Sequence, residues 1–354
     1  MKDMDALKKY KQSRKKCFLF GLALAAAIFL LITYTVGLGA MELTYPDVLK
    51  IIWGKISGNE EVLYGIKEGA IAVVWKIRLP RIICGAFVGA GLATAGVIFQ
   101  SILQNPLADP YTLGISTGAA FGASLAILLN MMFGIFLSVP VTALAFSLLT
   151  LIAVTAISMR GGGLVSSNLI IAGIIVSAIF SAGISFMKML AGESVNSIVY
   201  WIMGSLGSKT WSDVALVAPV VLIGLAVSQF FTSDLNVMAL GESDAEALGV
   251  NTKRTRFMYL ALGSCITAVC VSVCGVIGFI GLVVPHLLRF SLTSDNRMLM
   301  PLSALFGAFL LCGADNVTRL ISNGEIPVGV LTTLLGGPFF IYIFVRRKGS
   351  VRAE

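Results

Sequence analysis

Long runs of apolar residues, with charged residues confined to their ends, constrain this chain more than any other feature of its sequence. A helix that crosses a bilayer needs about 20 apolar residues, because each residue adds about 1.5 Å across a hydrocarbon core of about 30 Å. Several runs reach this length, and each is predicted to span a membrane once. They lie at residues 17–38, 82–103, 113–132, 139–159, 168–190, 214–231, 298–320 and 328–345.

Residues 257–292 form one nearly unbroken apolar run that needs a different interpretation. As a single helix this run would be about 54 Å long, which exceeds the bilayer even with tilt. It must therefore fold into two spans, with residues 275–278 as the predicted turn and Pro285 making the second span short or bent. The predicted fold is an all-α integral membrane protein of about ten transmembrane helices, organised as a single domain over residues 1–354.

Composition supports a membrane protein and argues against several other classes. The chain is 57% hydrophobic and 12% charged, whereas a soluble domain carries about 25% charged residues. Its net charge of +8 does not indicate nucleic-acid binding, because the charges lie at the ends of apolar runs and no soluble basic face is evident. The six cysteines form no C-x-x-C pair, so neither disulfides nor a metal site is predicted; Cys270 and Cys274 are interpreted as packing residues.

The distribution of Lys and Arg predicts the orientation in the membrane. With ten spans and the amino terminus inside, the inner side carries 17 of the 26 Lys and Arg residues and the outer side carries 9. Both termini are therefore predicted to be cytoplasmic. The first apolar run is longer than the roughly 7 to 15 residues of a cleaved signal peptide, so it is interpreted as a retained helix.

Two further features concern the organisation of the spans. The longest polar stretch, residues 39–80, is predicted to be an outer loop that is too short for an independent core. A short echo of sequence links residues 96–98 with residues 275–277. Spans two to five and spans seven to ten are five helices apart, an odd number, so a duplication would give an inverted repeat.

The candidate enzyme motifs in the sequence are incomplete. Residues 204–210 resemble a phosphate-binding loop, but the pattern requires Gly directly before Lys. Gly85, Gly89 and Gly96 lie inside an apolar span and are interpreted as sites of close helix packing. The single histidine, His286, has no acidic residue nearby in sequence, so no catalytic role is predicted for it.

Residues 236–250, between spans six and seven, form a polar segment on the predicted inner side. Gly241 interrupts it and Gly249 closes it, which favours two very short helices with a bend. Such a segment could dock another protein from the cytoplasm. An ordinary connecting loop is the alternative.

Several motifs now stand in a fixed order along the chain. Together they closely resemble the permeases of ATP-binding cassette (ABC) importers for iron-siderophores, haem and vitamin B12, of the FecCD type. The resemblance runs from about residue 78 to the carboxyl end, whereas the first 75 residues resemble the family only in layout. The motifs are RLPR at 78–81, GVIFQ at 96–100, QNPLADP at 104–110, LGISTG at 113–118, MALGE at 238–242, ALG at 247–249, GFIGLVVPHLLR at 278–289, EIPVG at 325–329 and LGGP at 335–338.

The resemblance implies a multi-pass permease of the cell membrane that works as a homodimer. Its implied partners are two cytoplasmic ATPase subunits, which use ATP and Mg²⁺, and a soluble substrate-binding protein outside. This chain itself is expected to bind no cofactor and to hydrolyse no ATP. The implied cargo is an iron-siderophore, haem or cobalamin, although relatives that carry oxyanions share the motifs.

The resemblance also assigns roles to individual residues. Residues 183–190 and 201–204 are expected to border the substrate path, and three groups of residues are given specific functions. The coupling residues are Met238, Ala239, Leu240, Gly241, Glu242, Ala247, Leu248 and Gly249. The inner gate residues are Asn105, Leu107, Ser166 and Ser167, and the residues that dock the binding protein are Arg78, Arg81 and Arg319.

Alternatives remain open at this point. Arg81 could simply anchor a helix end, and the loop at 161–163 departs from the family near Ser166. A secondary transporter or channel would need ionisable groups within the membrane. The clearest such group, Asp315, has Arg319 one turn away and is interpreted as one half of a helix-stabilising pair. A membrane enzyme would need clustered histidines or carboxylates, which the sequence lacks.

Overall fold

The computed structural model describes residues 2–37, 43–322 and 326–351, and side chains for 11–37, 43–321 and 326–341. All regular elements in these ranges are helical. The longer helices are α1 (Lys2–Gly37), α4 (Leu79–Ile102), α5 (Ile115–Phe133), α6 (Val139–Arg160), α7 (Ser166–Ala191), α9 (Trp211–Phe230), α12 (Thr252–Cys274), α14 (Asn296–Ser322) and α15 (Val328–Val351). The shorter ones are α2 (Tyr45–Ser57), η1 (Glu60–Leu63), α3 (Glu68–Ala72), η2 (Val73–Arg78), η3 (Gly192–Ser194), α8 (Val195–Ile202), α10 (Thr232–Met238), α11 (Glu242–Ala247) and α13 (Ile280–Ser291).

The prediction of about ten spans is confirmed. In the described ranges eight helices are long and apolar enough to cross a membrane, and two shorter apolar helices, Ile280–Ser291 and Val328–Ile341, bring the number to ten. The apolar run from 257 to 292 divides as expected, because α12 ends at Cys274 and α13 begins at Ile280. The second span is longer than the sequence indicated, since η2 joins α3 to α4 and makes Glu68–Ile102 one continuous helix.

Helix α4 lies at the centre of the bundle, buried along most of its length between α9, α12, α13 and α14. Its glycines bring backbones together, which confirms their interpretation as packing sites. A Cβ on Gly89 would collide with the carbonyl oxygen of Gly307, and a Cβ on Gly91 would lie 2.8 Å from the sulfur of Cys270. In a lipid environment such close van der Waals packing takes over much of the role that hydrophobic burial has in water.

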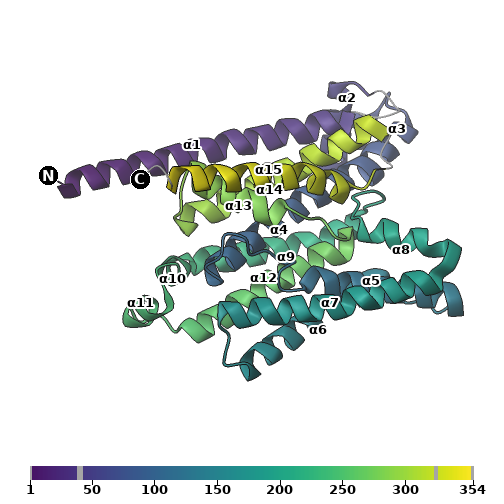
Figure 1. Cartoon of the computed structure of the whole chain (residues 1–354). Helices are drawn as coiled ribbons and strands as arrows, with labels where there is room; N and C mark the ends of the chain where they lie inside the picture. The colour runs from purple at the N-terminus through teal and green to yellow at the C-terminus, as the bar shows by residue number, and fades with distance from the viewer. Residues whose placement is uncertain (1, 38–42, 323–325, 352–354) are drawn as a thin grey trace.

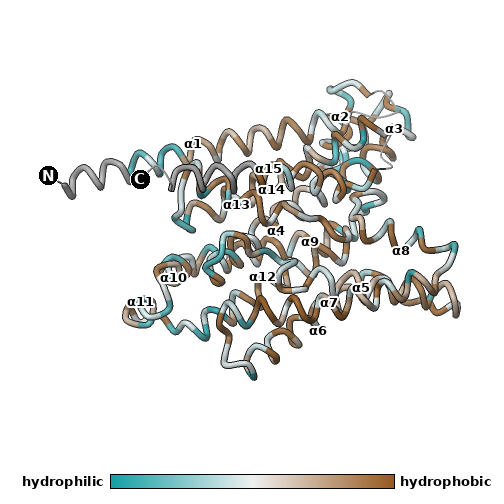
Figure 2. Tube along the Cα trace, viewed as in Figure 1, coloured by the Kyte–Doolittle hydropathy of each residue, from teal (hydrophilic) through white to brown (hydrophobic). Residues whose placement is uncertain are grey.

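The two ends of the bundle differ in character. Figure 1 shows the start of α1, the end of α15, α10 and α11 at one end, and α2, α3 and α8 at the other. Figure 2 shows hydrophobic residues along the middle of the long helices, with hydrophilic residues gathered towards their ends. We refer below to the α10–α11 end and the α2–α8 end.

The segment predicted as an outer loop, residues 39–80, is largely helical where the structure describes it. Val48 and Ile51 of α2 pack in one cluster with Leu79 of α4 and Cys312 of α14. Arg78 is buried, with 6% of its surface exposed, and it donates hydrogen bonds to the carbonyl oxygens of Val36 (2.8 Å) and Gly37 (3.1 Å) at the end of α1. This segment therefore joins α1 to the centre of the bundle.

Candidate functional site

Residues 232–250 include two short helices that project from the bundle, and we call this segment the coupling arm after the role that the family resemblance predicts for it. Helix α10 ends at Met238 and α11 begins at Glu242, which confirms the predicted pair of short helices with a bend. The bend lies at Gly241, whose φ of 128° and ψ of 159° belong to a region that is essentially restricted to glycine. Leu240 and Leu248 are 64% and 63% exposed, so the arm offers apolar side chains to a partner.

The coupling arm is attached first to the connection between α4 and α5. Gln104 lies directly after α4 and donates from Nε2 to the carbonyl oxygen of Met238 over 2.6 Å. The next residue, Asn105, accepts from the backbone N–H of Leu107 over 2.9 Å and so holds a tight turn. The two predicted gate residues of this loop, Asn105 and Leu107, therefore lie one and three residues after a residue that binds the arm.

A second attachment runs through Arg256 of α12, whose side chain is almost completely buried. Its Nη1 donates to the carbonyl oxygen of Leu164 over 2.7 Å, and its Nη2 donates to the carboxylate of Glu242 over 3.2 Å. Leu164 stands two residues before Ser166, at which α7 begins. One guanidinium thus joins the coupling arm to the segment that carries the other predicted gate residues, Ser166 and Ser167.

A third attachment links the arm to the start of α14. Asn236 donates to the carboxylate of Asp295 over 2.7 Å and accepts from the backbone N–H of Asn296 over 2.8 Å. Arg289 of α13 donates to the hydroxyl of Ser101 in α4 over 2.7 Å. These polar contacts connect the arm with the helix ends beneath it.

The loop between α4 and α5 folds back between helices. Asp109 is buried there and accepts from the backbone N–H groups of Tyr111 (3.1 Å) and Thr112 (3.0 Å). Burial raises the pKa of Asp109 to about 6, and these two hydrogen bonds act in the opposite direction. The carboxylate serves as the turn-forming acceptor of the loop.

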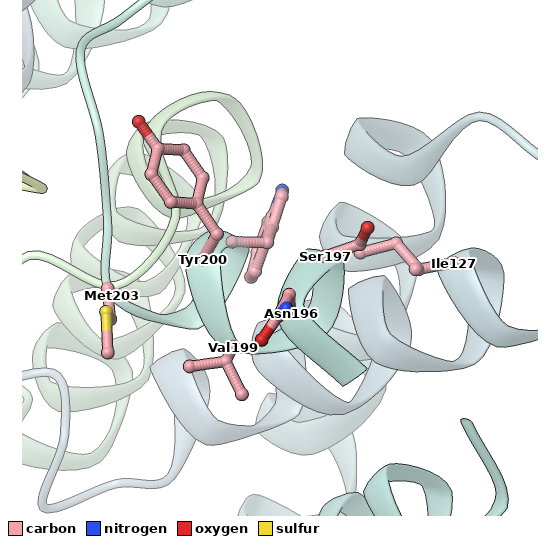
Figure 3. Close-up of a pocket in the computed structure, with 7 residues that line it drawn as sticks. Ile127, Asn196, Ser197, Val199, Tyr200 and Met203 are labelled. Atoms are coloured by element: carbon pink, nitrogen blue, oxygen red, sulfur yellow. The ribbon is translucent and has the colours of Figure 1, made fainter. Parts of the chain in front are cut away.

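Two hollows mark a candidate path through the molecule. The first, of about 650 Å³, is lined by Ile127 of α5, by α8 residues that include Asn196 and Tyr200, and by Met203, which follows α8 (Figure 3). The second, of about 610 Å³, is bordered again by Met203 and by the turn between α12 and α13, the start of α15 and Asp109. Because Met203 lines both, the hollows adjoin, and the expected border at 201–204 lies between them.

The three arginines predicted to dock a binding protein all lie near the α2–α8 end. Arg81 holds Asp315 of α14 with two hydrogen bonds, from Nε (2.9 Å) and from Nη2 (2.7 Å). Asp315 attracts Arg319 electrostatically, as expected within α14, and its close ion pair with Arg81 additionally joins α14 to α4. Arg78 is buried against the end of α1, so both Arg78 and Arg81 have structural partners within this chain.

The segment that resembles a phosphate loop serves as a structural connector. Ser205 donates its backbone N–H to the carbonyl oxygen of Cys274 over 2.8 Å, and Lys209 donates from Nζ to that of Val273 over 2.7 Å.

His286 contacts the ring of Phe340, with centroids 5.8 Å apart. Among the residues that the structure describes, no cluster of three or more His, Cys, Asp or Glu side chains could hold a metal ion.

Neither Gln104 nor Arg256 was assigned a role from the sequence, although the spacing of residues around Arg256 indicates that it is buried. Arg256 lies three, four and seven residues before Tyr259, Leu260 and Gly263, all of which are buried. This spacing places the arginine on the packed face of α12, whereas in the sequence it was counted only among the basic residues of the inner side. No comparable pattern distinguishes Gln104.

Fold and site together define a multi-pass membrane permease with a protruding arm linked to its helix connections. The FecCD transport family matches residues 25–346, and the chain belongs to this family of ABC transporter permeases of the cell membrane. The cobalamin import system permease protein BtuC of Halobacterium salinarum is 41% identical over 290 residues, which cover 82% of this chain and 77% of that protein. The molybdate import system permease protein MolB of Haemophilus influenzae is 34% identical over 337 residues, which cover 94% and 97%.

A solved structure supports the same assignment. It is described as an inward-facing conformation of a metal-chelate type ABC transporter. It is 31% identical in sequence to this chain, covers 92% of this chain and 98% of its own, and gives a TM-score of 0.80. The family and this likeness confirm the resemblance that the sequence motifs indicated.

Proposed function

We propose that this chain is the translocating subunit of an importer, and that the coupling arm transmits the nucleotide-driven movement of an ATPase to the gate. The observation that carries this proposal is the attachment of one arm to both predicted gate segments. Gln104 connects it to the loop of Asn105 and Leu107, and Arg256 connects it to the start of α7. A displacement of the arm would therefore be felt at both segments together.

The arm's place in the fold supports the proposed orientation. It lies at the same end of the bundle as the start of α1 and the end of α15, which carry the basic segments counted as cytoplasmic. Two chains would form a homodimer, with two ATPase subunits at the α10–α11 end. A substrate-binding protein would bind at the α2–α8 end.

The proposed cargo is an iron-siderophore, haem or a corrinoid such as cobalamin. Two adjoining hollows lined largely by apolar side chains suit a large cargo that is held weakly, because a tight site would retain it. A relative named for molybdate import keeps oxyanions as the alternative cargo class. A proton- or ion-coupled transporter is less well supported, since Asp315, its clearest candidate group, is neutralised by Arg81.

Reconstituted transport tests the proposed function. The permease, the ATPase and the binding protein encoded beside it are placed in proteoliposomes and offered labelled cobalamin, haem, a ferric siderophore and molybdate. We expect uptake of one cargo that requires ATP, the ATPase and the binding protein together. Uptake driven by an ion gradient without ATP would overturn the proposal.

The gate assignment predicts contact between protomers. Cysteines placed at Asn105 or Leu107, with the exposed Cys265 replaced by serine, are expected to cross-link two protomers in the closed state. Tyr64, which is fully accessible at the α2–α8 end, supplies a control cysteine that should react with a soluble thiol reagent. Normal labelling of the control without any cross-link at 105 or 107 would refute this gate.

We also propose that Arg78, Arg81 and Arg319 dock the binding protein, and that the rate of its association depends on salt concentration. Charged residues that dock a partner act mainly on the association rate, so Arg81→Glu or Arg319→Glu should chiefly slow association and flatten its dependence on salt. Asp315→Asn is the matched control for Arg81, because it breaks the internal ion pair and keeps the arginine. If Arg81→Glu and Asp315→Asn lower thermal stability alike while association is unchanged for every arginine variant, the docking role is wrong.

A further inference from the structure

Helix α2 carries apolar side chains on two sides. On one side Val48 and Ile51 are completely buried against the bundle. On another side Trp53 and Ile56 are 64% and 67% exposed, and Tyr45 and Leu49 are exposed as well. The spacing of these four residues by four, four and three positions places them on one stripe along the helix. A helix of 13 residues that faced only water would not gather its apolar exposed residues in this way.

The stripe begins beside exposed apolar residues of α1. This helix spans the membrane, and near the α2–α8 end it exposes Phe29, Leu30 and Tyr34. Tyr45, the first residue of α2, donates from its hydroxyl to that of Thr33 over 3.1 Å. Helix α2 therefore starts beside the level at which α1 leaves the membrane, and Figure 1 shows α2 at that end of α1.

The chemistry of the stripe fits the boundary between headgroups and acyl chains. Tyrosine and tryptophan concentrate at this boundary, because each has an apolar ring and a polar group. Lys50 and Lys55 are also exposed on α2, and their long side chains can reach lipid phosphates. With these charges and 13 residues, α2 is too short and too polar to cross the bilayer.

We propose that α2 is an interfacial helix whose stripe of Tyr45, Leu49, Trp53 and Ile56 inserts into the phospholipid leaflet at the α2–α8 end. The buried side of α2 is packed on Leu79 and Cys312, so the lipid contact is passed on to α4 and α14. Arg78 binds the end of α1 from the same segment. The anchor thus fixes the depth of the central helix while the rest of the bundle moves.

Fluorescence quenching in proteoliposomes tests this proposal. The emission of Trp53 is obtained as the difference between the native permease and Trp53→Phe, so that the other tryptophans cancel. We expect this component to lose most of its intensity in phosphatidylcholine brominated on its acyl chains, and to be protected from iodide in the water. A tryptophan introduced by Tyr64→Trp, in the Trp53→Phe background, serves as the aqueous control and should respond to iodide alone.

Either of two results would overturn the proposal. In the first, Trp53 responds to iodide as strongly as the control tryptophan and is unaffected by brominated lipid, which would place the stripe in water. In the second, protection from iodide arises only when the binding protein is added, which would make the stripe a protein contact. Both readouts come from the folded full-length permease and do not depend on the transported cargo.

Discussion

Gly96→Ala is expected to disrupt the packing of the central helix α4. A Cβ at this position would collide with the backbone carbonyl of Gly281, so α13 must move away from α4. Overpacking of a well-packed interior typically costs about 1–3 kcal/mol, and here a backbone group rather than a flexible side chain stands in the way. We expect the variant to lose several degrees of thermal stability in detergent and to yield little monodisperse protein.

Gly313→Ala in α14 is the matched control for this experiment. No atom lies within 4 Å of a Cβ built on Gly313, so the same substitution adds a methyl group without a clash. Its melting temperature should equal or exceed that of the native permease, because alanine favours helix over glycine. Equal stability of the two variants would contradict the close approach of α4 and α13.

Gly241→Val is expected to abolish coupling while the bundle stays intact. The backbone of Gly241 lies in a region that costs other residues about 1–3 kcal/mol, so the bend between α10 and α11 must change. Since, among the residues that the structure describes, nothing beyond its chain neighbours lies within 4 Å of a Cβ at this position, we expect the effect to be confined to the arm. We expect ATP-driven uptake in proteoliposomes to fall at least about tenfold, which corresponds to about 1.4 kcal/mol.

Gly134→Val separates this effect from a general effect of strained glycines. Gly134 also has a positive φ, 63°, and open space around it, but it caps the end of α5 outside the coupling arm. Its substitution introduces a comparable local strain of about 1–3 kcal/mol, but because this strain lies outside the arm, uptake per folded permease should stay within about twofold of the native rate. Native uptake by Gly241→Val, or equal losses in both variants, would refute the coupling role of the arm.

The exposed leucines of the arm fit the same interpretation. Leu240 and Leu248 flank α11, and the acidic residues of that helix lie between them. A partner groove that received these leucines would be sensitive to the angle between the two short helices. The strain introduced at Gly241 would change this angle directly.

The sequence by itself determined the number and nature of the spans. Bilayer thickness fixes the length of a crossing helix, and hydropathy over about 20 residues is a local property that needs no knowledge of neighbours. The division of residues 257–292 follows from the same limit on helix length. The bend at Gly241 was predicted separately, from a glycine that interrupts a short polar segment. The motifs shared with the family also indicated where the arm and the gate segments lie.

Only the tertiary structure decided which polar groups meet. Asp315 is one turn from Arg319 in sequence, but its close ion pair with Arg81 of α4 depends on helix packing, which local spacing cannot reveal. Arg256 and Gln104 likewise acquire their roles from carbonyl groups of distant segments. The second apolar side of α2 also became evident only in the fold, because the sequence does not show which of its apolar residues the bundle buries and which it leaves exposed.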